Sequence, residues 1–304
     1  PAGIWHQFKL EGLKPGAVYT YEGFDGSAAV GGGTFRTNPA AGTSRFRFAV
    51  IGDTGSGTRH QLAVAEQMTA WKPDFVLHVG DVIYERGEDV NFGPRFFAPY
   101  GALAARSVIY LSPGNHDYGN PKAANYFAHF EGPRASVADS ERWYTTTYGD
   151  AQIFGLDTNQ PFGEGSVQYR WLAAQLAASR APWKFAFFHH PPYSGGEHGG
   201  SPYVRAAFGP LFEAHDVQVV FAGHDHHYER MKPIDDFAHD GRPTTYLVSG
   251  GGGAWLRRAQ ATAKTAFVRS AYHFLGVEVA GDRLTGSAIG EDGKAFDTWS
   301  VNKN

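Results

Sequence analysis

Residues 45–55, RFRFAVIGDTG, join a run of apolar residues to a short polar turn. The apolar part, residues 46–51, is typical of a buried strand, because hydrophobic side chains occupy almost every position. Gly52 and Asp53 follow at once, and the same order of apolar run, glycine and acidic residue returns at Val79-Gly80-Asp81. After residue 45 such strands alternate with helical stretches, which predicts an α/β fold with an antiparallel end.

The elements follow from the periodicity of apolar residues. Helices are predicted at 61–71, 167–178 and 203–215, and residues 90–104 are expected to be partly helical. Strands are predicted at 46–51, 75–79, 108–111, 143–148, 151–156, 185–188, 217–222, 245–249, 274–279, 284–289 and 296–301. Residues 143–156 are typical of a hairpin, with Gly149-Asp150 at its turn.

The first forty residues have a different pattern, with short strands predicted at 7–12, 17–24 and 34–37. A β-sandwich needs about seven strands, so these residues indicate only part of one. Residues 38–44, NPAAGTS, have the composition of a linker. We therefore expect a β domain fragment at 1–40 and a separate α/β domain at 41–304. The chain opens at Pro1 in a strand-like pattern, which indicates a fragment or a processed form.

Composition excludes several classes of function. The 304 residues include no cysteine, so disulfides, thiolate metal sites and cysteine nucleophiles are ruled out. The net charge of -3 offers no basic field for nucleic acid. No apolar run reaches the roughly 18 residues that span a membrane, so we expect no membrane insertion. No signal peptide is recognisable, and the oligomeric state stays open.

Polar side chains of the kinds that bind metals follow five of the apolar runs. Asp53 and Asp81 lie 28 residues apart, and Asp81 and Asn115 lie 34 apart. A β-α-β unit takes roughly 30 residues, so this spacing predicts successive parallel strands of one sheet. Ligand sites in such sheets form beyond the carboxyl ends of the strands. The candidate ligands are Asp53, Asp81, Tyr84, Asn115, His189, His224 and His226.

This donor set is a mixture of carboxylate, amide, phenol and imidazole groups without sulfur. It suits Fe, Mn or Zn better than Ca or Mg alone. A single zinc ion takes three or four protein ligands, so seven candidates are too many for one ion. The set suits two ions that share a carboxylate, which is the arrangement used for phosphoryl transfer.

The motifs resemble the five blocks of the purple acid phosphatases, in that family's order. They are Gly52-Asp53-Thr54-Gly55, Gly80-Asp81-Val82-Ile83-Tyr84, Gly114-Asn115-His116-Asp117, His189-His190-Pro191 and Gly223-His224-Asp225-His226. The resemblance covers about residues 45 to 300, and Tyr228-Glu229-Arg230 is similar to plant-type members. His6, Leu13-Lys14-Pro15-Gly16 and Phe35-Arg36-Thr37 resemble the end of the fibronectin-III-like domain that precedes the catalytic domain in that family.

The resemblance implies a metallophosphoesterase fold, a four-layer α/β/β/α sandwich preceded by a partial fibronectin-III-like β-sandwich. It implies Fe(III) held by Asp53, Asp81, Tyr84 and His226. A second ion, Fe(II), Zn or Mn, is held by Asp81, Asn115, His189 and His224, with Asp81 bridging. A metal-bound hydroxide would hydrolyse phosphate monoesters of small substrates. His116 would contact the phosphate and help the leaving group.

Three further histidines, His198, His189 and His190, are candidates for a place in the site. Glu197-His198-Gly199 resembles a stretch of mammalian members in which the histidine faces the substrate, so His198 is a second catalytic candidate. His189 and His190 compete for one metal position, because a strand turns alternate residues to opposite faces. The spacing to Pro191 favours His189 and leaves His190 beside the site or packed in the core.

Other polar residues are given structural roles. We expect His78 to be a hydrogen-bonded core residue, His227 to be structural and Asp157 to stabilise a turn. Residues 250–253 predict a flexible glycine loop near the rim, and Arg230 is expected to orient a ligand through Glu229.

Two alternatives to a phosphomonoesterase stay open. One is a phosphodiesterase that uses the same metal site, and the other is a non-catalytic binding protein. The family resemblance further implies a secreted or periplasmic location.

Overall fold

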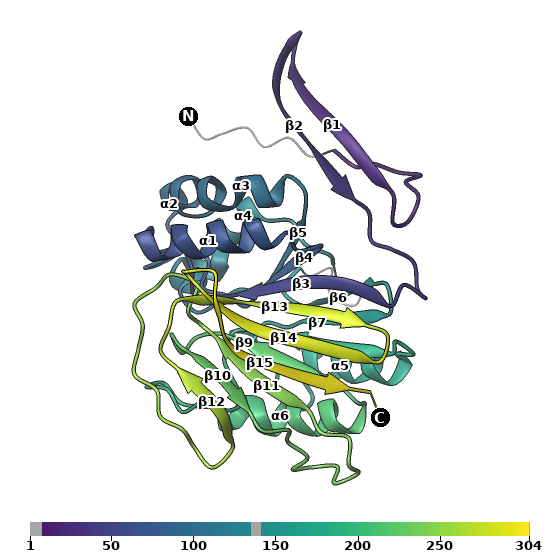
Figure 1. Cartoon of the computed structure of the whole chain (residues 1–304), viewed down its shortest axis with the longest axis vertical. Helices are drawn as coiled ribbons and strands as arrows, with labels where there is room; N and C mark the ends of the chain where they lie inside the picture. The colour runs from purple at the N-terminus through teal and green to yellow at the C-terminus, as the bar shows by residue number, and fades with distance from the viewer. Residues whose placement is uncertain (1–7, 135–140, 304) are drawn as a thin grey trace.

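The computed structural model describes residues 8–134 and 141–303. Two β-sheets pack face to face, and helices cover the outer face of each sheet (Figure 1). The predicted α/β/β/α arrangement is therefore confirmed. Among the described residues no helix is long and apolar enough to cross a lipid bilayer.

One sheet has six strands in the order β15-β14-β13-β3-β4-β5. Its parallel part is β3, β4 and β5, and β13, β14 and β15 continue it as antiparallel neighbours. The bounds are β3 (Arg45–Ile51), β4 (Phe75–His78), β5 (Val108–Leu111), β13 (His273–Ala280), β14 (Arg283–Gly290) and β15 (Ala295–Asn302).

The other sheet has seven strands in the order β12-β10-β11-β9-β8-β7-β6. Strands β11, β9, β8 and β7 run parallel, whereas β6, β10 and β12 are antiparallel to their neighbours. The bounds are β6 (Tyr144–Tyr148), β7 (Ala151–Gly155), β8 (Trp183–Phe187), β9 (Val219–Ala222), β10 (Tyr228–Met231), β11 (Thr245–Ser249) and β12 (Thr265–Arg269). Strands β10 and β12 had not been predicted.

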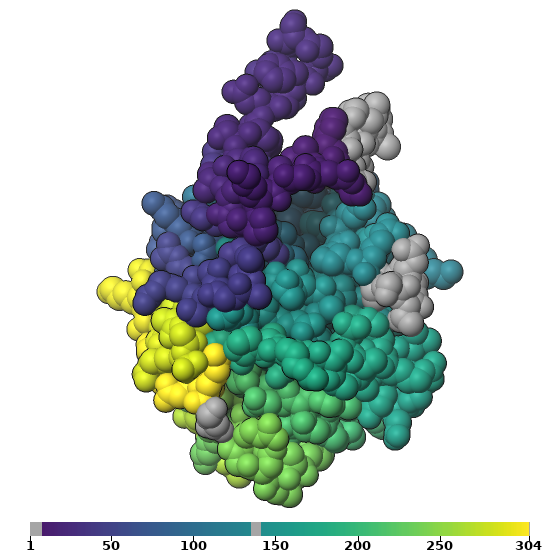
Figure 2. All heavy atoms as spheres, turned by 90° about the vertical axis from the view of Figure 1, so that its right-hand side faces the viewer, coloured from purple at the N-terminus to yellow at the C-terminus, as the bar shows by residue number. Residues whose placement is uncertain are grey.

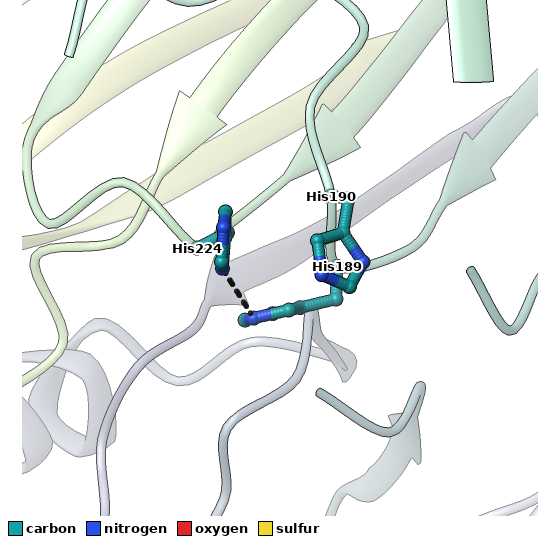
Figure 3. A group of neighbouring side chains, drawn as sticks. All are labelled: His189, His190 and His224. Atoms are coloured by element: carbon teal, nitrogen blue, oxygen red, sulfur yellow. Dashed lines mark hydrogen bonds between the residues drawn. The ribbon is translucent and has the colours of Figure 1, made fainter. Parts of the chain in front are cut away.

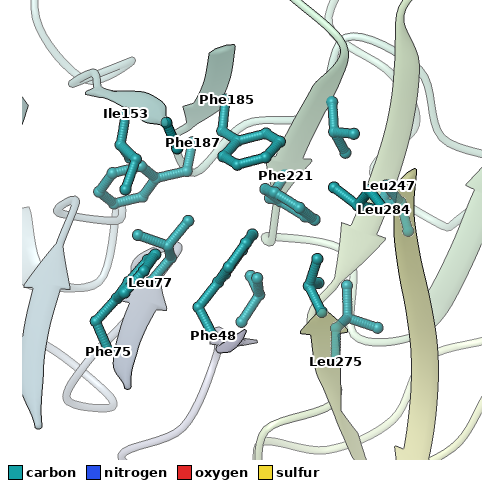
Figure 4. Close-up of a cluster of buried hydrophobic side chains, with 14 of the residues drawn as sticks. Phe48, Phe75, Leu77, Ile153, Phe185, Phe187, Phe221, Leu247, Leu275 and Leu284 are labelled. Atoms are coloured by element: carbon teal, nitrogen blue, oxygen red, sulfur yellow. The ribbon is translucent and has the colours of Figure 1, made fainter. Parts of the chain in front are cut away.

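Strand β3 shows why the sheets pack as they do. Phe46, Phe48 and Val50 point into the core between the sheets, whereas Ala49 and Ile51 point into the core beneath the helices. This alternation is the ordinary two-residue period of a strand, and both faces are apolar because both are covered. Aromatic rings fill the space between the sheets, and Phe48 stacks on Phe75 with ring centroids 4.9 Å apart (Figure 4).

Helices form the two outer layers, and short polar residues cap the longer ones. Thr58 caps the helix on the six-stranded side, and Ser166 and Ser201 cap those on the seven-stranded side. The first group comprises α1 (Arg59–Trp71), α2 (Asp89–Phe92), the π-turn η1 (Gly93–Phe97), α3 (Ala98–Ala104), the 3-10 turns η2 (Asp117–Gly119) and η3 (Pro121–Ala123), and α4 (Ala124–His129). The second comprises α5 (Val167–Ala178) and α6 (Pro202–Ala214).

The N-terminal region is an antiparallel hairpin of β1 (Val18–Asp25) and β2 (Ala28–Arg36). Figure 2 shows it standing away from the body of the molecule. The strand predicted at 7–12 is not found at the described residues 8–12, and Gln7 lies outside the described residues. His6, named for the family resemblance, also lies outside them. The hairpin is mostly exposed and by itself is not a sandwich. The fibronectin-III-like fragment and the boundary at 41 stay predictions.

Candidate metal centre

The candidate ligands come from two sheets and not from one. Asp53, Asp81 and Asn115 follow β3, β4 and β5 of the six-stranded sheet. His189 and His224 follow β8 and β9 of the seven-stranded sheet. The spacing prediction is confirmed for Asp53, Asp81 and Asn115, because β3, β4 and β5 are successive parallel neighbours in one sheet. Spacing did not reveal that His189 and His224 follow strands of the other sheet. The facing carboxyl ends of the two parallel segments nevertheless bring the five loops together.

Glycines allow the loops to approach one another closely. A Cβ atom on Gly114 would lie 2.1 Å from Asp81 Oδ1, and a Cβ atom on Gly80 would lie 2.6 Å from His189 Nδ1. Gly80 also has a φ of +101°, which side chains rarely adopt. Packing around the site therefore requires the glycines before Asp81 and Asn115.

Tyr84 lies at the centre of the first group of ligands. Its hydroxyl lies 3.1 Å from Asp53 Oδ1 and 3.0 Å from Asp81 Oδ2. It also lies 3.0 Å from His226 Nε2. All four side chains are nearly inaccessible to solvent. Four ligand-type atoms thus converge on one buried point.

Asn115 lies at the centre of the second group. Its Oδ1 atom is 3.0 Å from His189 Nε2 and 2.9 Å from His224 Nδ1. These two ring nitrogens are 3.3 Å from each other. Asp81 joins the two groups, because the Oδ2 atom that contacts Tyr84 also lies 3.3 Å from His189 Nε2.

Hydrogen bonds to backbone carbonyls determine which imidazole nitrogens face the centre. His189 Nδ1 lies 2.9 Å from Val79 O, and His226 Nδ1 lies 2.7 Å from Trp255 O. A carbonyl oxygen only accepts, so both Nδ1 atoms carry a proton. In the neutral rings, the bare Nε2 lone pairs therefore point at other acceptors, as in metal-bound histidines.

The acceptors in both groups outnumber the protons available to them, which shows whether the residues fit metal ions. The Tyr84 hydroxyl has one proton and can satisfy only one of the three acceptors around it. His189 Nε2 likewise faces two oxygen atoms, Asn115 Oδ1 and Asp81 Oδ2. Buried acceptors that face one another without a donor are costly unless a cation lies between them. The donor set therefore fits two cations.

The shifted pKa values also indicate that this cluster of buried acceptors favours a bound positive charge. Burial raises the pKa of Tyr84 well above its ordinary value, and the carboxylates of Asp53 and Asp81 raise it further. Burial lowers the pKa of an imidazole, but Asp81 outweighs it and raises the pKa of His189 to about 9. Burial would raise the pKa of Asp81, but His189 holds it well below its usual range.

The two predicted catalytic histidines lie on either side of the ligands. His116 Nδ1 is 2.5 Å from Glu85 O, and His116 Nε2 lies 4.0 Å from Asp81 Oδ2. The His116 side chain is 28% exposed, so it faces the open side of the site. His198 stacks on His224 with ring centroids 4.3 Å apart. Both therefore lie close to the ligand groups without belonging to them.

His189 and His190 both approach the second group, as Figure 3 shows. One ring nitrogen of His189, one of His190 and one of His224 lie within 4.8 Å of one another. The argument from strand alternation does not apply here, because β8 ends at Phe187. His190 therefore turns to the same side as His189.

Two aspartates position the site loops, and sequence reasoning assigned them no role. Asp117 accepts hydrogen bonds from the backbone N–H groups of Val82, Ile83 and Gly114. Asp225 accepts from the Ser194 hydroxyl and from the backbone N–H of His198. Both aspartates lie inside the motifs, close to predicted ligands, and that position could have identified them from the sequence.

The remaining predictions have mixed outcomes. His78 is buried and lies 3.0 Å from Thr54 Oγ1, as expected of a core histidine, and His227 is buried beside Glu229. Asp157 binds the backbone N–H of Asn159, as expected of a residue in a turn, and it also binds the Tyr118 hydroxyl.

Two predictions about this region were wrong, the second only in part. Arg230 pairs with Asp297 at 2.8 Å and does not act through Glu229, because neighbouring residues of β10 point to opposite faces. Residues 250–253 lie next to Asp53 near the rim, as predicted, but they are buried and do not form an exposed flexible loop. The N–H of Gly252 donates to Gly52 O, and that of Ala254 donates to Asp53 O.

Comparison with known proteins identifies related sequences. The family model for calcineurin-like phosphoesterases matches residues 46–228. The chain is 31% identical to the phosphoenolpyruvate phosphatase of Allium cepa, over 79% of this chain and 53% of that protein. It is 26% identical to purple acid phosphatase 15 of Arabidopsis thaliana, over 83% of this chain and 54% of that protein. The chain thus spans about half the length of these relatives.

Solved structures share the fold. A purple acid phosphatase from yellow lupin (Lupinus luteus) seeds superposes with a TM-score of 0.86 at 21% identity, covering 96% of this chain and 61% of the lupin chain. PhoD superposes with a TM-score of 0.74 at 17% identity, covering 96% of this chain and 77% of that chain. The strand order, the converging ligands and the family match agree, and this chain belongs to the calcineurin-like phosphoesterase family, as a relative of the purple acid phosphatases.

Proposed function

We propose that this chain hydrolyses phosphate monoesters at a centre of two metal ions. The observation that supports the proposal most directly is the pair of ligand groups joined by Asp81. One group surrounds the Tyr84 hydroxyl and the other surrounds Asn115 Oδ1. In each group several hydrogen-bond acceptors face one another, and a single proton cannot satisfy all of them. The relatives named above as phosphatases support the reaction class.

The two groups define the proposed metal positions. The first position has a phenol, two carboxylates and one imidazole, from Tyr84, Asp53, Asp81 and His226. The second position has one carboxylate, one amide oxygen and two imidazoles, from Asp81, Asn115, His189 and His224. The oxygen-rich first set favours Fe(III), and the nitrogen-rich second set suits Fe(II), Zn or Mn.

When bound, two such ions polarise the phosphoryl oxygens and lower the pKa of water to near neutrality. The chain itself orients the substrate and moves protons. His116 Nδ1 donates to the backbone carbonyl of Glu85, which leaves His116 Nε2 facing the open side. A proton on that atom can pass to the departing alkoxide, so we assign His116 as the general acid. His198, which stacks on His224, is assigned a contact with the phosphate.

Metal analysis of the purified protein, combined with a visible absorption spectrum, tests the metal assignment. We expect two ions per chain and, in iron-loaded protein, a violet colour from phenolate bound to Fe(III). Zn or Mn alone in a colourless, active protein would contradict the iron assignment but not the phosphatase. A single ion per chain would contradict the dinuclear centre.

A pair of substrates tests the reaction. We expect a higher kcat/KM for 4-nitrophenyl phosphate than for bis(4-nitrophenyl) phosphate. The opposite order would show a phosphodiesterase that uses the same ligands. Metal-loaded protein that hydrolyses neither ester, nor other phosphate esters, would favour a binding protein.

Three further proposals rest on the family relationship. Residues 1–40 are the end of a fibronectin-III-like domain, with the catalytic domain beginning at residue 41. The substrate is a small phosphorylated molecule. The protein works in a secreted or periplasmic location. Attachment of a reporter enzyme, followed by fractionation of the source cells, tests the location.

A further inference from the structure

His190 is the ligand-type residue beside the second metal position that the proposed function leaves without a role. Its ring lies 4.5 Å from that of His224 and 5.0 Å from that of His189, measured between centroids. The side chain is partly exposed, whereas that of His189 is fully buried. His190 is thus more accessible to solvent than His189, and Figure 3 shows its ring next to those of His189 and His224.

Thr158 fixes the orientation of the His190 ring. Thr158 Oγ1 accepts from the backbone N–H of His190 at 3.2 Å and lies 2.7 Å from His190 Nδ1. Thr158 as a whole residue is only 7% exposed, and among the described residues His190 Nδ1 is the acceptor within hydrogen-bond distance of its hydroxyl. When the hydroxyl donates to Nδ1, the ring carries its proton on Nε2. Nε2 is then a donor whether the ring is neutral or charged.

The distances suit a contact through an oxygen atom bound at the second position. Ring nitrogens of His189, His190 and His224 lie within 4.8 Å of one another. An ion would lie about 2.1 Å from the nitrogens of His189 and His224. A phosphoryl oxygen on that ion, hydrogen-bonded at about 2.9 Å, bridges up to about 5 Å between the ion and a donor nitrogen. Four protein ligands already serve that ion in the proposed assignment.

We propose that His190 Nε2 donates a hydrogen bond to an oxygen of the phosphoryl group bound at the second metal position, with Thr158 as its positioning residue. This inference rests on the proposed function and extends it. It adds a third histidine that contacts the substrate, next to His116 and His198. A donor at this point stabilises the phosphate dianion and the charge on its oxygens during transfer.

Binding of inorganic phosphate to the metal-loaded protein, measured by calorimetry, tests the proposal without relying on turnover. A hydrogen bond to a charged group changes affinity roughly 10- to 100-fold, so His190→Ala should raise the Kd for phosphate by about that factor. His190→Gln, which keeps an N–H donor, should recover part of the loss. Thr158→Val should weaken phosphate binding less, and Thr158→Ser should bind as the wild type does.

His215→Gln is the matched control. His215 is a partly exposed histidine at the end of α6, before the start of β9 and away from His224. The His215→Gln substitution should leave the Kd for phosphate unchanged. Melting temperatures of all variants show whether the fold is kept, and the Thr158 pair still tests the proposal if His190→Ala does not fold.

Two results would overturn the proposal. If His190→Ala binds phosphate like the wild type, Nε2 does not reach the phosphoryl oxygens. If His190→Ala loses its second ion, His190 is a metal ligand. Failure of the proposed function looks different: a wild type that binds two ions and phosphate but hydrolyses no ester contradicts the phosphatase and leaves the His190 measurement valid.

Discussion

The six-stranded sheet carries the candidate oxygen ligands of the proposed metal centre, whereas the seven-stranded sheet carries the candidate nitrogen ligands. Asp53, Asp81, Tyr84 and Asn115 follow strands of the first sheet. His189, His224 and His226 follow strands of the second. Each proposed metal position takes atoms from both sheets. The centre is therefore complete only when the sheets pack correctly, and ions bound there should connect the two halves of the fold.

Left-handed backbone conformations occur on both sides of the site, since His224 also has a φ of 71°. Asp53 and Asp81 both have left-handed backbone conformations, with φ of 58° and 53°. Such values are uncommon outside glycine and are best tolerated by Asp and Asn. The same turn thus presents a carboxylate after two neighbouring strands. On the other side, carbonyl oxygens of Val79 and Trp255 orient the rings of His189 and His226.

The largest effect is expected for the residue that both metal positions share. Asp81→Ala should lose one or both ions and essentially all activity, because its carboxylate contacts both groups. Asp53→Ala and His189→Ala should each lose only the ion on their own side. Metal content and turnover measure these effects. Two retained ions with near-normal turnover in Asp81→Ala would contradict the bridging role.

His116→Ala should reduce kcat by about 10²–10⁴-fold, the usual contribution of general acid catalysis. The loss should grow with the pKa of the leaving group, since better leaving groups need less protonation. Metal content should stay at two ions, because His116 lies outside both ligand groups. A metal-depleted His116→Ala protein would instead show that His116 is a ligand.

Tyr84→Phe should remove the colour of the iron-loaded protein and weaken binding of the ion at the first metal position. Tyr84 lies near three acceptors of that position, so its phenolate is the expected source of the absorption. The second ion should stay, because Asn115, His189 and His224 are unchanged. Absorption spectra with metal analysis provide the measurement. An unchanged spectrum would assign the colour to a different tyrosine.

The smallest effect concerns a contact between the sheets that lies away from the ligands. Arg230 of β10 binds Asp297 of β15 through two nitrogens, at 2.8 and 3.1 Å. Arg230→Gln should lower the free energy of unfolding by about 1.5–3 kcal/mol, since hydrogen bonds to charged groups contribute about that much. Thermal denaturation measures the loss.

Activity should be unchanged in Arg230→Gln, because Arg230 does not contact Glu229 or the site. A drop in turnover without a drop in stability would restore the role that the sequence had suggested for it.

Local pattern was sufficient for most elements and for naming the candidate ligands that the structure brings together. Strand β5, helix α5 and strand β11 have the bounds expected from periodicity, because each is set by neighbouring residues in the chain. Strand β10 escaped prediction, since its four residues follow the His224–His226 turn without an apolar run of their own. Its strand conformation comes from pairing with β11 and β12.

The sequence by itself determined the α/β class, the five motifs and the residues available for a metal centre, because these depend on residue type and local spacing. Only the tertiary structure decided that the ligands are divided between two sheets. It also decided that His190 turns toward the site and that Arg230 turns away from it. Strand pairing, the end of β8 and the partner of an arginine depend on contacts between residues far apart in the chain. No local pattern encodes those contacts.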